Sequence, residues 1–457
     1  MESKLLIAFY GDDFTGSTDA LDFLGRAGIK TVLFIDPPSR EQLDRYQGLQ
    51  AIGVAGMTRA MSPEKMEQEL RPAFQALKEL NPRHVHYKVC STFDSSPTVG
   101  SIGRAIEVGA AVFNSKFVPL LVAAPALGRH CVFGNLFAKM GIGSDGAIFR
   151  LDRHPSMSRH PVTPADESDL RLHLSRQTVK KVGLIDILQL EKEVPETREA
   201  VEKLLTEGNE VVLFDGLYQS QLKTIGAVID SFADAGQTLF SVGSSGVEMA
   251  LSDFWRASGS IAGKSEWDLL PCDTPLLVVS GSCSPVSSRQ IAYALEAGFK
   301  EIALDTVRLA IEDDPTKLLE QYAAEATALI TAGFDVIIHS STGNDDKRVI
   351  ETDGVFRDKG LPKSETSRLY GTALGTIAKR VAEQTTLQRI IIAGGDTSSY
   401  AARAMGIEAV EMIAPLAPGA PLCKAHAPGS AIDGKEVNFK GGQVGKEDYF
   451  VSAKGRA

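Results

Sequence analysis

The sequence predicts an α/β protein of two domains, each a largely parallel sheet flanked by helices. Short apolar, β-rich runs alternate with amphipathic segments throughout the chain, and its 457 residues exceed what one hydrophobic core normally serves. The alternation breaks at 257–272, a stretch that begins small and polar and ends near two prolines. We therefore expect a first domain at 1–256, a linker at 257–272 and a second domain at 273–457.

The predicted strands are the apolar runs of this alternation. In the first half they are 4–10, 30–35, 50–54, 84–89, 118–123, 181–185, 210–214 and 238–242. In the second half they are 276–280, 301–304, 335–339, 389–393 and 409–413. Intervening segments such as Pro63–Leu80 and 194–206 carry apolar residues at helical spacing, so we expect helices there.

Composition excludes several classes of function. Hydrophobic residues make up 43% and charged residues 23%, as in ordinary globular proteins. A net charge of −10 without a basic stripe argues against a nucleic-acid partner. No apolar run is long enough to span a bilayer, and the apolar run near the N-terminus is too short for a signal peptide. The five cysteines are widely spaced and odd in number, which predicts reduced thiols and a cytoplasmic location.

Two adjacent carboxylates follow the first predicted strand. Asp12 and Asp13 come directly after it, at the strand end where open α/β sheets bind ligands. Ser17 and Thr18 are expected to start a helix running from Asp19 to about residue 26. The alternative is that the two aspartates only cap this helix and form a turn. Because neighbouring side chains of an extended chain point to opposite sides, we expect one of the pair to face a ligand.

Two further strand–turn–helix junctions lie in the second half. After strand 276–279 comes the turn Ser280-Gly281-Ser282-Cys283-Ser284, and Pro285 is expected as the first residue of the next helix. After strand 389–393 comes the turn Gly394-Gly395-Asp396-Thr397-Ser398, and a helix is expected from Tyr400. Each turn either presents N–H groups to an anion or is an ordinary tight connection, and Asp396 by itself reads as a helix N-cap. The glycine-lysine-serine stretch at 259–265 has three residues between its glycines and no strand before it, so we do not expect a Walker A loop.

Several motifs, in this order, resemble the four-carbon acid sugar kinase family over nearly the whole chain. They are Asp12–Asp19, Tyr87–Ser95, Ser158–Pro164, Ser280–Ser284, Gly394–Ser398 and Gly441–Asp448. The resemblance implies transfer of the γ-phosphate of ATP, with Mg²⁺, to a hydroxyl of threonate, erythronate, 3-oxo-tetronate or 3-oxo-isoapionate. It implies the terminal hydroxyl as acceptor and an active site in the cleft between the domains.

The resemblance also implies where each ligand binds. Asp12 and Asp13 are the candidate catalytic carboxylates, with a slight preference for Asp13. The candidate nucleotide-binding residues are Ser282, Ser284, Gly394, Gly395 and Gly442, while no magnesium ligand is identified. The candidate substrate-binding residues are Lys88, Ser91, Asp94, Arg159 and His160.

An acid sugar needs a cation for its carboxylate, which Arg159 and Lys88 offer, and acceptors for its hydroxyls, which Asp94 offers. Alternatives stay open for each. One alternative is that Lys88 is a surface lysine at a strand end, and another is that Arg159 pairs with Asp166 or Glu167. The alternative for Asp94 is that it caps a helix starting near residue 97.

The sequence departs from the family at Gly11, where relatives usually carry alanine, and at Ala123–His130, where relatives carry Phe-Pro and an asparagine ahead of Gly-Arg. These differences leave the identity of the acid substrate open.

The other hypotheses are a non-catalytic acid-sugar or nucleotide-binding protein and a dinucleotide-dependent dehydrogenase, although the first strand lacks the glycine fingerprint a dehydrogenase needs. We expect small-molecule partners without nucleic acid or membrane, and homo-oligomerisation stays open.

Overall fold

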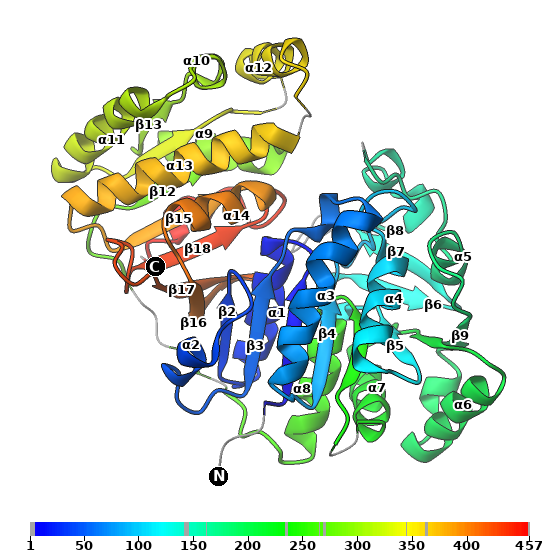
Figure 1. The fold of residues 1–457 in the computed structure, drawn as a ribbon. Coiled ribbons are helices and arrows are strands. Elements are labelled where there is room, and N and C mark those ends of the chain that lie inside the picture. Colours follow the sequence, from blue (N-terminus) through cyan, green and yellow to red (C-terminus); the bar gives the residue numbers. More distant parts are fainter. Residues whose placement is uncertain are drawn as a thin grey trace. The chain divides into compact units, whose positions relative to one another are not determined.

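The computed structural model describes residues 5–140, 146–160, 162–233, 236–264, 266–267, 271–343, 345–361 and 364–455. The chain folds into two compact units, Met1–Ser265 and Glu266–Ala457. Each is a mostly parallel sheet flanked by helices, which confirms the predicted fold class (Figure 1). The division falls inside the segment predicted as a linker, of which residues 265 and 268–270 lie outside the described residues.

The strands described in the large N-terminal sheet are all parallel. Its strand order is β2 (Thr31–Phe34), β3 (Ala51–Ala55), β1 (Ile7–Gly11), β4 (His84–Lys88), β11 (Leu239–Gly243), β5 (Val118–Leu121), β10 (Val211–Phe214) and β9 (Val182–Ile185). From β1 the chain passes to β2, returns to β3 beside β1, and then crosses to β4 on the other side of β1. The strand order therefore reverses between β1 and β4, and ligands of open α/β sheets bind beside such a switch point.

Helices cover both faces of this sheet. Tyr87 on β4 and Tyr10 on β1 pack against Phe74 of α3, whereas the neighbouring His86 bonds to Glu248 of α8. Because side chains alternate along a strand, α3 and α8 lie on opposite faces. The helices are α1 (Phe14–Arg26), α2 (Arg40–Asp44), α3 (Pro63–Glu79), α4 (Ile102–Phe113), α5 (Leu170–Ser175), α6 (Val194–Thr206), α7 (Gln219–Ser231) and α8 (Gly246–Ala257).

A smaller antiparallel sheet follows β5. Its strands are β6 (Arg129–Val132), β7 (Asn135–Lys139) and β8 (Ile148–Arg150). Short 3₁₀ turns punctuate the unit at η1 (Thr58–Ala60), η2 (Pro125–Leu127), η3 (Leu151–Arg153), η4 (Met157–Arg159) and η5 (Gln189–Glu191).

The C-terminal sheet is also mostly parallel, and its strand order also reverses near the middle. Its order is β13 (Lys300–Ala303), β14 (Val336–His339), β12 (Leu277–Ser280), β15 (Arg389–Ala393), β18 (Glu436–Lys440), β17 (Ala420–His426) and β16 (Ala409–Ala417), with β17 antiparallel to both neighbours. The chain leaves β12 for β13 and β14, then crosses to β15 on the other side. The switch point of this unit therefore lies between β12 and β15.

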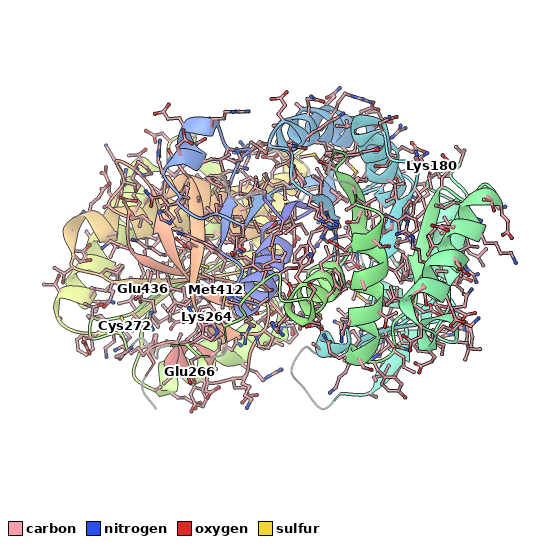
Figure 2. The ribbon with its side chains drawn as sticks, turned by 90° about the horizontal axis from the view of Figure 1, so that it is seen from below. Lys180, Lys264, Glu266, Cys272, Met412 and Glu436 are labelled. Carbon is pink, nitrogen blue, oxygen red and sulfur yellow. The ribbon has the colours of Figure 1, made fainter. Side chains whose placement is uncertain are left out.

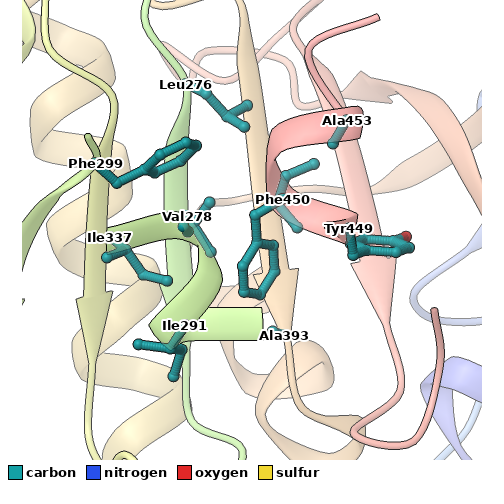
Figure 3. Close-up of a cluster of buried hydrophobic side chains, with 11 residues drawn as sticks. Leu276, Val278, Ile291, Phe299, Ile337, Ala393, Tyr449, Phe450 and Ala453 are labelled. Atoms are coloured by element: carbon teal, nitrogen blue, oxygen red, sulfur yellow. The ribbon is translucent and has the colours of Figure 1, made fainter. Parts of the chain in front are cut away.

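The core of the C-terminal unit brings the end of the chain onto the central strands. Phe450 and Tyr449 of the short terminal helix join Leu276, Val278 and Ile291 in one buried cluster (Figure 3). Glu436 (Figure 2), at the start of β18, pairs with the buried Arg389 of β15 at 2.6 Å. The helices are α9 (Pro285–Glu296), α10 (Thr306–Ile311), α11 (Thr316–Thr331), α12 (Lys347–Asp358), α13 (Ser364–Gln384), α14 (Gly395–Ala404) and α15 (Tyr449–Ser452).

Every predicted strand has a counterpart, and the helices predicted at 63–80 and 194–206 are present. Two predicted helix starts are wrong. Helix α1 begins at Phe14 rather than near Asp19, because Asp13 caps it, and α14 begins at Gly395 rather than Tyr400. None of the helices in the described part of the chain is both long and apolar enough to cross a membrane. All five cysteines are free.

Candidate functional site

The two aspartates after β1 share one arginine. Arg59 Nη2 lies 2.8 Å from Asp12 Oδ1 and Nη1 lies 2.7 Å from Asp13 Oδ2. The expectation that the two carboxylates point to opposite sides is therefore wrong, because the backbone bends where β1 meets α1. Arg59 comes from η1, after the carboxyl end of β3, and sequence reasoning missed it. Its position just beyond a predicted strand was the signal available.

The two carboxylates differ in their surroundings. Asp13 caps α1, accepting from Gly16 N at 2.6 Å, and also accepts from Thr15 Oγ1 at 3.0 Å. Asp12 has Arg59 as its side-chain partner and is 2% exposed. Burial raises the pKa of the Asp12 carboxyl, and the Arg59 guanidinium opposes that rise. The predicted capping role thus applies to Asp13, while Asp12 is a buried carboxylate with a raised pKa.

Lys88 lies at the end of β4, in register with Gly11 and Gly243. It is 1% exposed, which excludes the surface-lysine alternative. Its Nζ lies 3.4 Å from Asp19 Oδ2 and donates to the Val89 carbonyl at 3.0 Å. Although burial lowers the pKa of Lys88, the charges of Asp19 and the neighbouring acidic groups together outweigh it, and the net pKa is raised. Lys88 is therefore a buried ammonium at the switch point.

Buried polar atoms without partners gather around Lys88. Glu248 Oε1 lies 2.6 Å from His86 Nδ1, but its Oε2 has no hydrogen-bond partner among the described residues. Other buried atoms of this region that lack a partner within the described chain are Asp19 Oδ1, Asp94 Oδ1, Arg129 Nε and Ser245 Oγ. Buried polar groups are nearly always satisfied in native proteins, so such a cluster indicates that a polar ligand or water completes it.

The predicted substrate-binding segment after β4 is tightly folded. Phe93 adopts a left-handed conformation (φ +58°), which is strained for a bulky residue and is found preferentially at functional sites. Ser91 is buried, and Asp94 lines a cavity of about 10 Å³, room for about one water molecule. Helix α4 begins at Ile102 with Ser101 as its cap, so the capping alternative for Asp94 is wrong.

Within the described residues, Arg159 and His160 form no hydrogen bond or ion pair with the buried groups above. Arg159 is exposed at the end of η4. Its expected partner Asp166 pairs with Arg176 at 2.8 Å, so the proposed Arg159–Asp166 ion pair is absent from the described structure. His160 Nδ1 lies 2.9 Å from Thr163 Oγ1, which holds a local turn.

In the C-terminal unit, three loops meet at the carboxyl ends of β12, β15 and β18. Ser284 caps α9 by accepting from Ser287 N at 3.1 Å, and its hydroxyl donates to the Gly442 carbonyl. Ser282 Oγ accepts from Ser284 N at 3.3 Å. The predicted nucleotide-binding serines are therefore in direct contact with the predicted glycine loop.

The glycines of these loops are required by close packing. A Cβ on Gly442 would lie 2.8 Å from Ser282 Oγ, and one on Gly394 would lie 2.8 Å from Thr397 Oγ1. Gly394 also has φ +128°, a conformation that side-chain-bearing residues avoid. Gly394, not Asp396, occupies the N-cap position of α14, so the predicted capping role of Asp396 is wrong. Gly395 is the first residue of that helix.

Lys440, at the end of β18, is a further buried cation that sequence reasoning missed. It is 0% exposed, and its Nζ donates to Ser287 Oγ at 3.3 Å and to the Gly441 carbonyl at 3.0 Å. The ammonium also faces the rings of Tyr449 and Phe450, 5.7 Å and 5.9 Å away. Burial lowers the pKa of Lys440 to about 7. The strand that carries it was not predicted, which is why the residue escaped notice.

Comparison with known proteins relates the two units to two families. Residues 7–251 match the sugar-binding N-terminal domain, and residues 277–450 match the nucleotide-binding C-terminal domain. A 3-oxo-isoapionate kinase from Paraburkholderia graminis is 41% identical over 98% of this chain and 93% of the relative. A 3-oxo-tetronate kinase from Cupriavidus necator is 28% identical over 98% of this chain and 96% of the relative.

A solved structure, the Haemophilus influenzae protein HI1011, shares the fold with a TM-score of 0.71 at 24% identity, covering 98% of this chain and 99% of that chain. These relatives favour neither a dehydrogenase nor a non-catalytic binding protein. The two domain models span the chain in the order expected of acid sugar kinases. The chain belongs to the four-carbon acid sugar kinase family.

Proposed function

We propose that this chain phosphorylates 3-oxo-isoapionate, or a closely related branched acid sugar, with ATP. The observation that carries the choice of acid is the 41% identity to a 3-oxo-isoapionate kinase, against 28% to a 3-oxo-tetronate kinase. The departure at Ala123–His130 from the sequence of other relatives agrees with a distinct acid, because this segment follows β5 at the ligand-binding end of the sheet.

Asp12 is the proposed general base for the attacking hydroxyl. Its buried carboxylate has a raised pKa, and a more basic carboxylate accepts a hydroxyl proton more readily. Asp13 is the proposed positioning residue, since three donors already hold it and it fixes the start of α1. Arg59 keeps both carboxylates in place. Lys88, Ser91, Asp94 and His160 remain proposed substrate contacts.

The proposed nucleotide site is the three-loop cluster of the C-terminal unit. The N-termini of α9 and α14 lie at these loops, where the helix dipoles favour an anion, and the glycines allow the backbone to approach the phosphates closely. Ser282, Ser284, Gly394, Gly395 and Gly442 form this cluster. For transfer, the γ-phosphate held here has to meet the hydroxyl oriented by Asp12.

Magnesium would accompany the phosphates of ATP. The donor set near the nucleotide loops suits a cation that keeps most of its water, because Asp396 is an exposed carboxylate in the first turn of α14, two residues from Gly394. Asp396 is the proposed protein ligand, with phosphate oxygens and water as the others. Bound there, the ion would neutralise the charge that develops on the transferred phosphoryl group.

The test is ATP consumption, coupled to ADP detection, across 3-oxo-isoapionate, 3-oxo-tetronate, threonate and erythronate. We expect the highest kcat/KM with 3-oxo-isoapionate. Faster turnover of 3-oxo-tetronate would refute the choice of acid but keep the kinase. No turnover with any acid, while Mg-ATP still binds, would place the acceptor outside this class.

A further inference from the structure

Arg129 is a buried guanidinium without an anion. It begins β6, is 6% exposed, and forms no ion pair with any described residue. Its Nη1 donates to the main-chain carbonyls of Leu127 and Lys139, each at 3.0 Å, and to that of Gly128 at 3.5 Å. Its Nε is buried and has no partner in the described part of the chain.

Such an arrangement is costly unless an anion completes it. A buried charge is normally paired, and a guanidinium without a carboxylate leaves donors and charge unmatched. Consistent with that cost, burial lowers the pKa of Arg129. The carbonyls that hold Nη1 fix the side chain before any ligand arrives, which reduces the entropy lost on binding. The residue therefore has the properties of a prepared anion-binding group.

Its position is at the ligand end of the N-terminal sheet. Arg129 bridges to Ala124, and the carbonyl of the preceding Ala123 lies against Gly246, where a Cβ would approach it to 2.0 Å. Gly246 begins α8, and its N–H donates to Ser244 Oγ at 3.1 Å. Asp19 and Asp94 act electrostatically on Arg129. The same region therefore holds a guanidinium that has no ion pair among the described residues, together with carboxylates that can accept hydrogen bonds from hydroxyl groups.

We propose that Arg129 binds the carboxylate of the acid sugar. The inference rests on the proposed function and extends it to the residue that makes the enzyme specific for acids. The planar fork of an arginine matches the two oxygens of a carboxylate. Arg159, the cation that the sequence favoured, is exposed and lacks any such fixed geometry.

The experiment compares an acid with a neutral analogue. The probes are 3-oxo-tetronate and erythrulose, a four-carbon ketose with a hydroxymethyl group where 3-oxo-tetronate has its carboxylate. The variants are Arg129→Gln and Arg129→Lys, with Arg159→Gln as the matched control. For each protein we would measure kcat/KM for both probes, the KM for ATP, and the affinity for 3-oxo-tetronate by calorimetry without ATP.

We expect Arg129→Gln to weaken 3-oxo-tetronate binding by at least about 30-fold, because a charge-paired hydrogen bond is lost. Its kcat/KM for erythrulose and its KM for ATP should change less than about threefold, so that the preference for the acid collapses. Arg129→Lys keeps the charge without the fork, and should lose part of the acid preference. Arg159→Gln should keep it.

Equal losses on both probes in Arg129→Gln would overturn the proposal, because a structural role would affect them alike. If Arg129→Gln does not fold, unchanged acid preference in Arg129→Lys overturns it instead, as does a selective loss in Arg159→Gln. Calorimetry separates this inference from the proposed function. A wild-type chain that binds 3-oxo-isoapionate without phosphorylating it refutes the function alone, whereas one that binds neither 3-oxo-isoapionate nor 3-oxo-tetronate refutes both.

Discussion

Replacing Lys440 by methionine should stabilise the C-terminal unit at neutral pH while removing a cation beneath the nucleotide loop. Burial lowers the pKa of Lys440 from 10.5 to about 7. That change corresponds to at most about 5 kcal/mol favouring the neutral amine. The unfolded chain binds this proton up to a higher pH than the folded chain does. Stability should therefore rise with pH between about 7 and about 10.5, and the cost is fully present below 7.

Lys440→Met removes the cost but also removes the hydrogen bonds to Ser287 and Gly441, about 1 kcal/mol each. We expect a net gain of about 2–3 kcal/mol at pH 6, seen as a Tm increase of roughly 4–12 °C for a unit of this size. The gain should shrink or reverse near pH 10. Mg-ADP affinity should fall in the variant, because a positive charge near the phosphates is gone.

The assay is scanning calorimetry at pH 6, 7.5 and 9.5, with the transition that Mg-ADP shifts upward assigned to the C-terminal unit. Lys424→Met, at an exposed lysine of β17, is the matched control and should change stability by less than about 0.5 kcal/mol at every pH. A Lys440→Met protein that is less stable than wild type at pH 6, or whose difference from wild type is the same at all three pH values, would refute the reasoning.

The remaining predictions concern the proposed base, its neighbour and the nucleotide loop. Asp12→Asn should lower kcat by about 10²–10⁴-fold with unchanged Mg-ATP affinity, and steady-state kinetics with near-normal kcat would remove Asp12 from the base role. Asp13→Asn should change the α1 cap only mildly, because asparagine also caps helices, so its kcat loss should be smaller than that of Asp12→Asn; the reverse order would identify Asp13 as the base. Gly394→Val should weaken Mg-ADP binding by at least tenfold in calorimetry, since its Cβ would lie 2.8 Å from Thr397 Oγ1 at φ +128°; normal affinity would exclude this loop from the nucleotide site.

Local patterning predicted most of the parallel strands, because most are short apolar runs that are buried on both faces. The exception is β18, which pairs in parallel with β15 and was not predicted. Strand β17 and the strands of the small sheet β6–β8 were not predicted, and only residues 409–413 of the longer β16 were. Burial in β16 and β7 alternates along the strand, and a short alternating run resembles the loops around it. Their pairing depends on contacts between strands rather than on the run itself.

The candidate site likewise contains residues that the sequence predicts and residues that it does not. Asp12 and Ser284 were found because each follows a strand that the sequence reveals. Arg59, Arg129 and Lys440 were missed, since what distinguishes them is burial and the presence or absence of a partner. Neither property can be read from a single lysine or arginine in a sequence. Charge pairing is a three-dimensional property, and here it separates the buried Arg129 from the exposed Arg159.

The most direct test of the central claim is to identify the product. Wild-type chain, Mg-ATP and 3-oxo-isoapionate would be incubated together, and the mixture analysed by mass spectrometry and ³¹P NMR. The account predicts a singly phosphorylated acid, formed in equal amount to ADP, with a phosphate-ester signal on a primary hydroxyl. ADP formed with free phosphate and no phosphorylated acid would contradict it, because the chain would then be an ATPase rather than an acid sugar kinase.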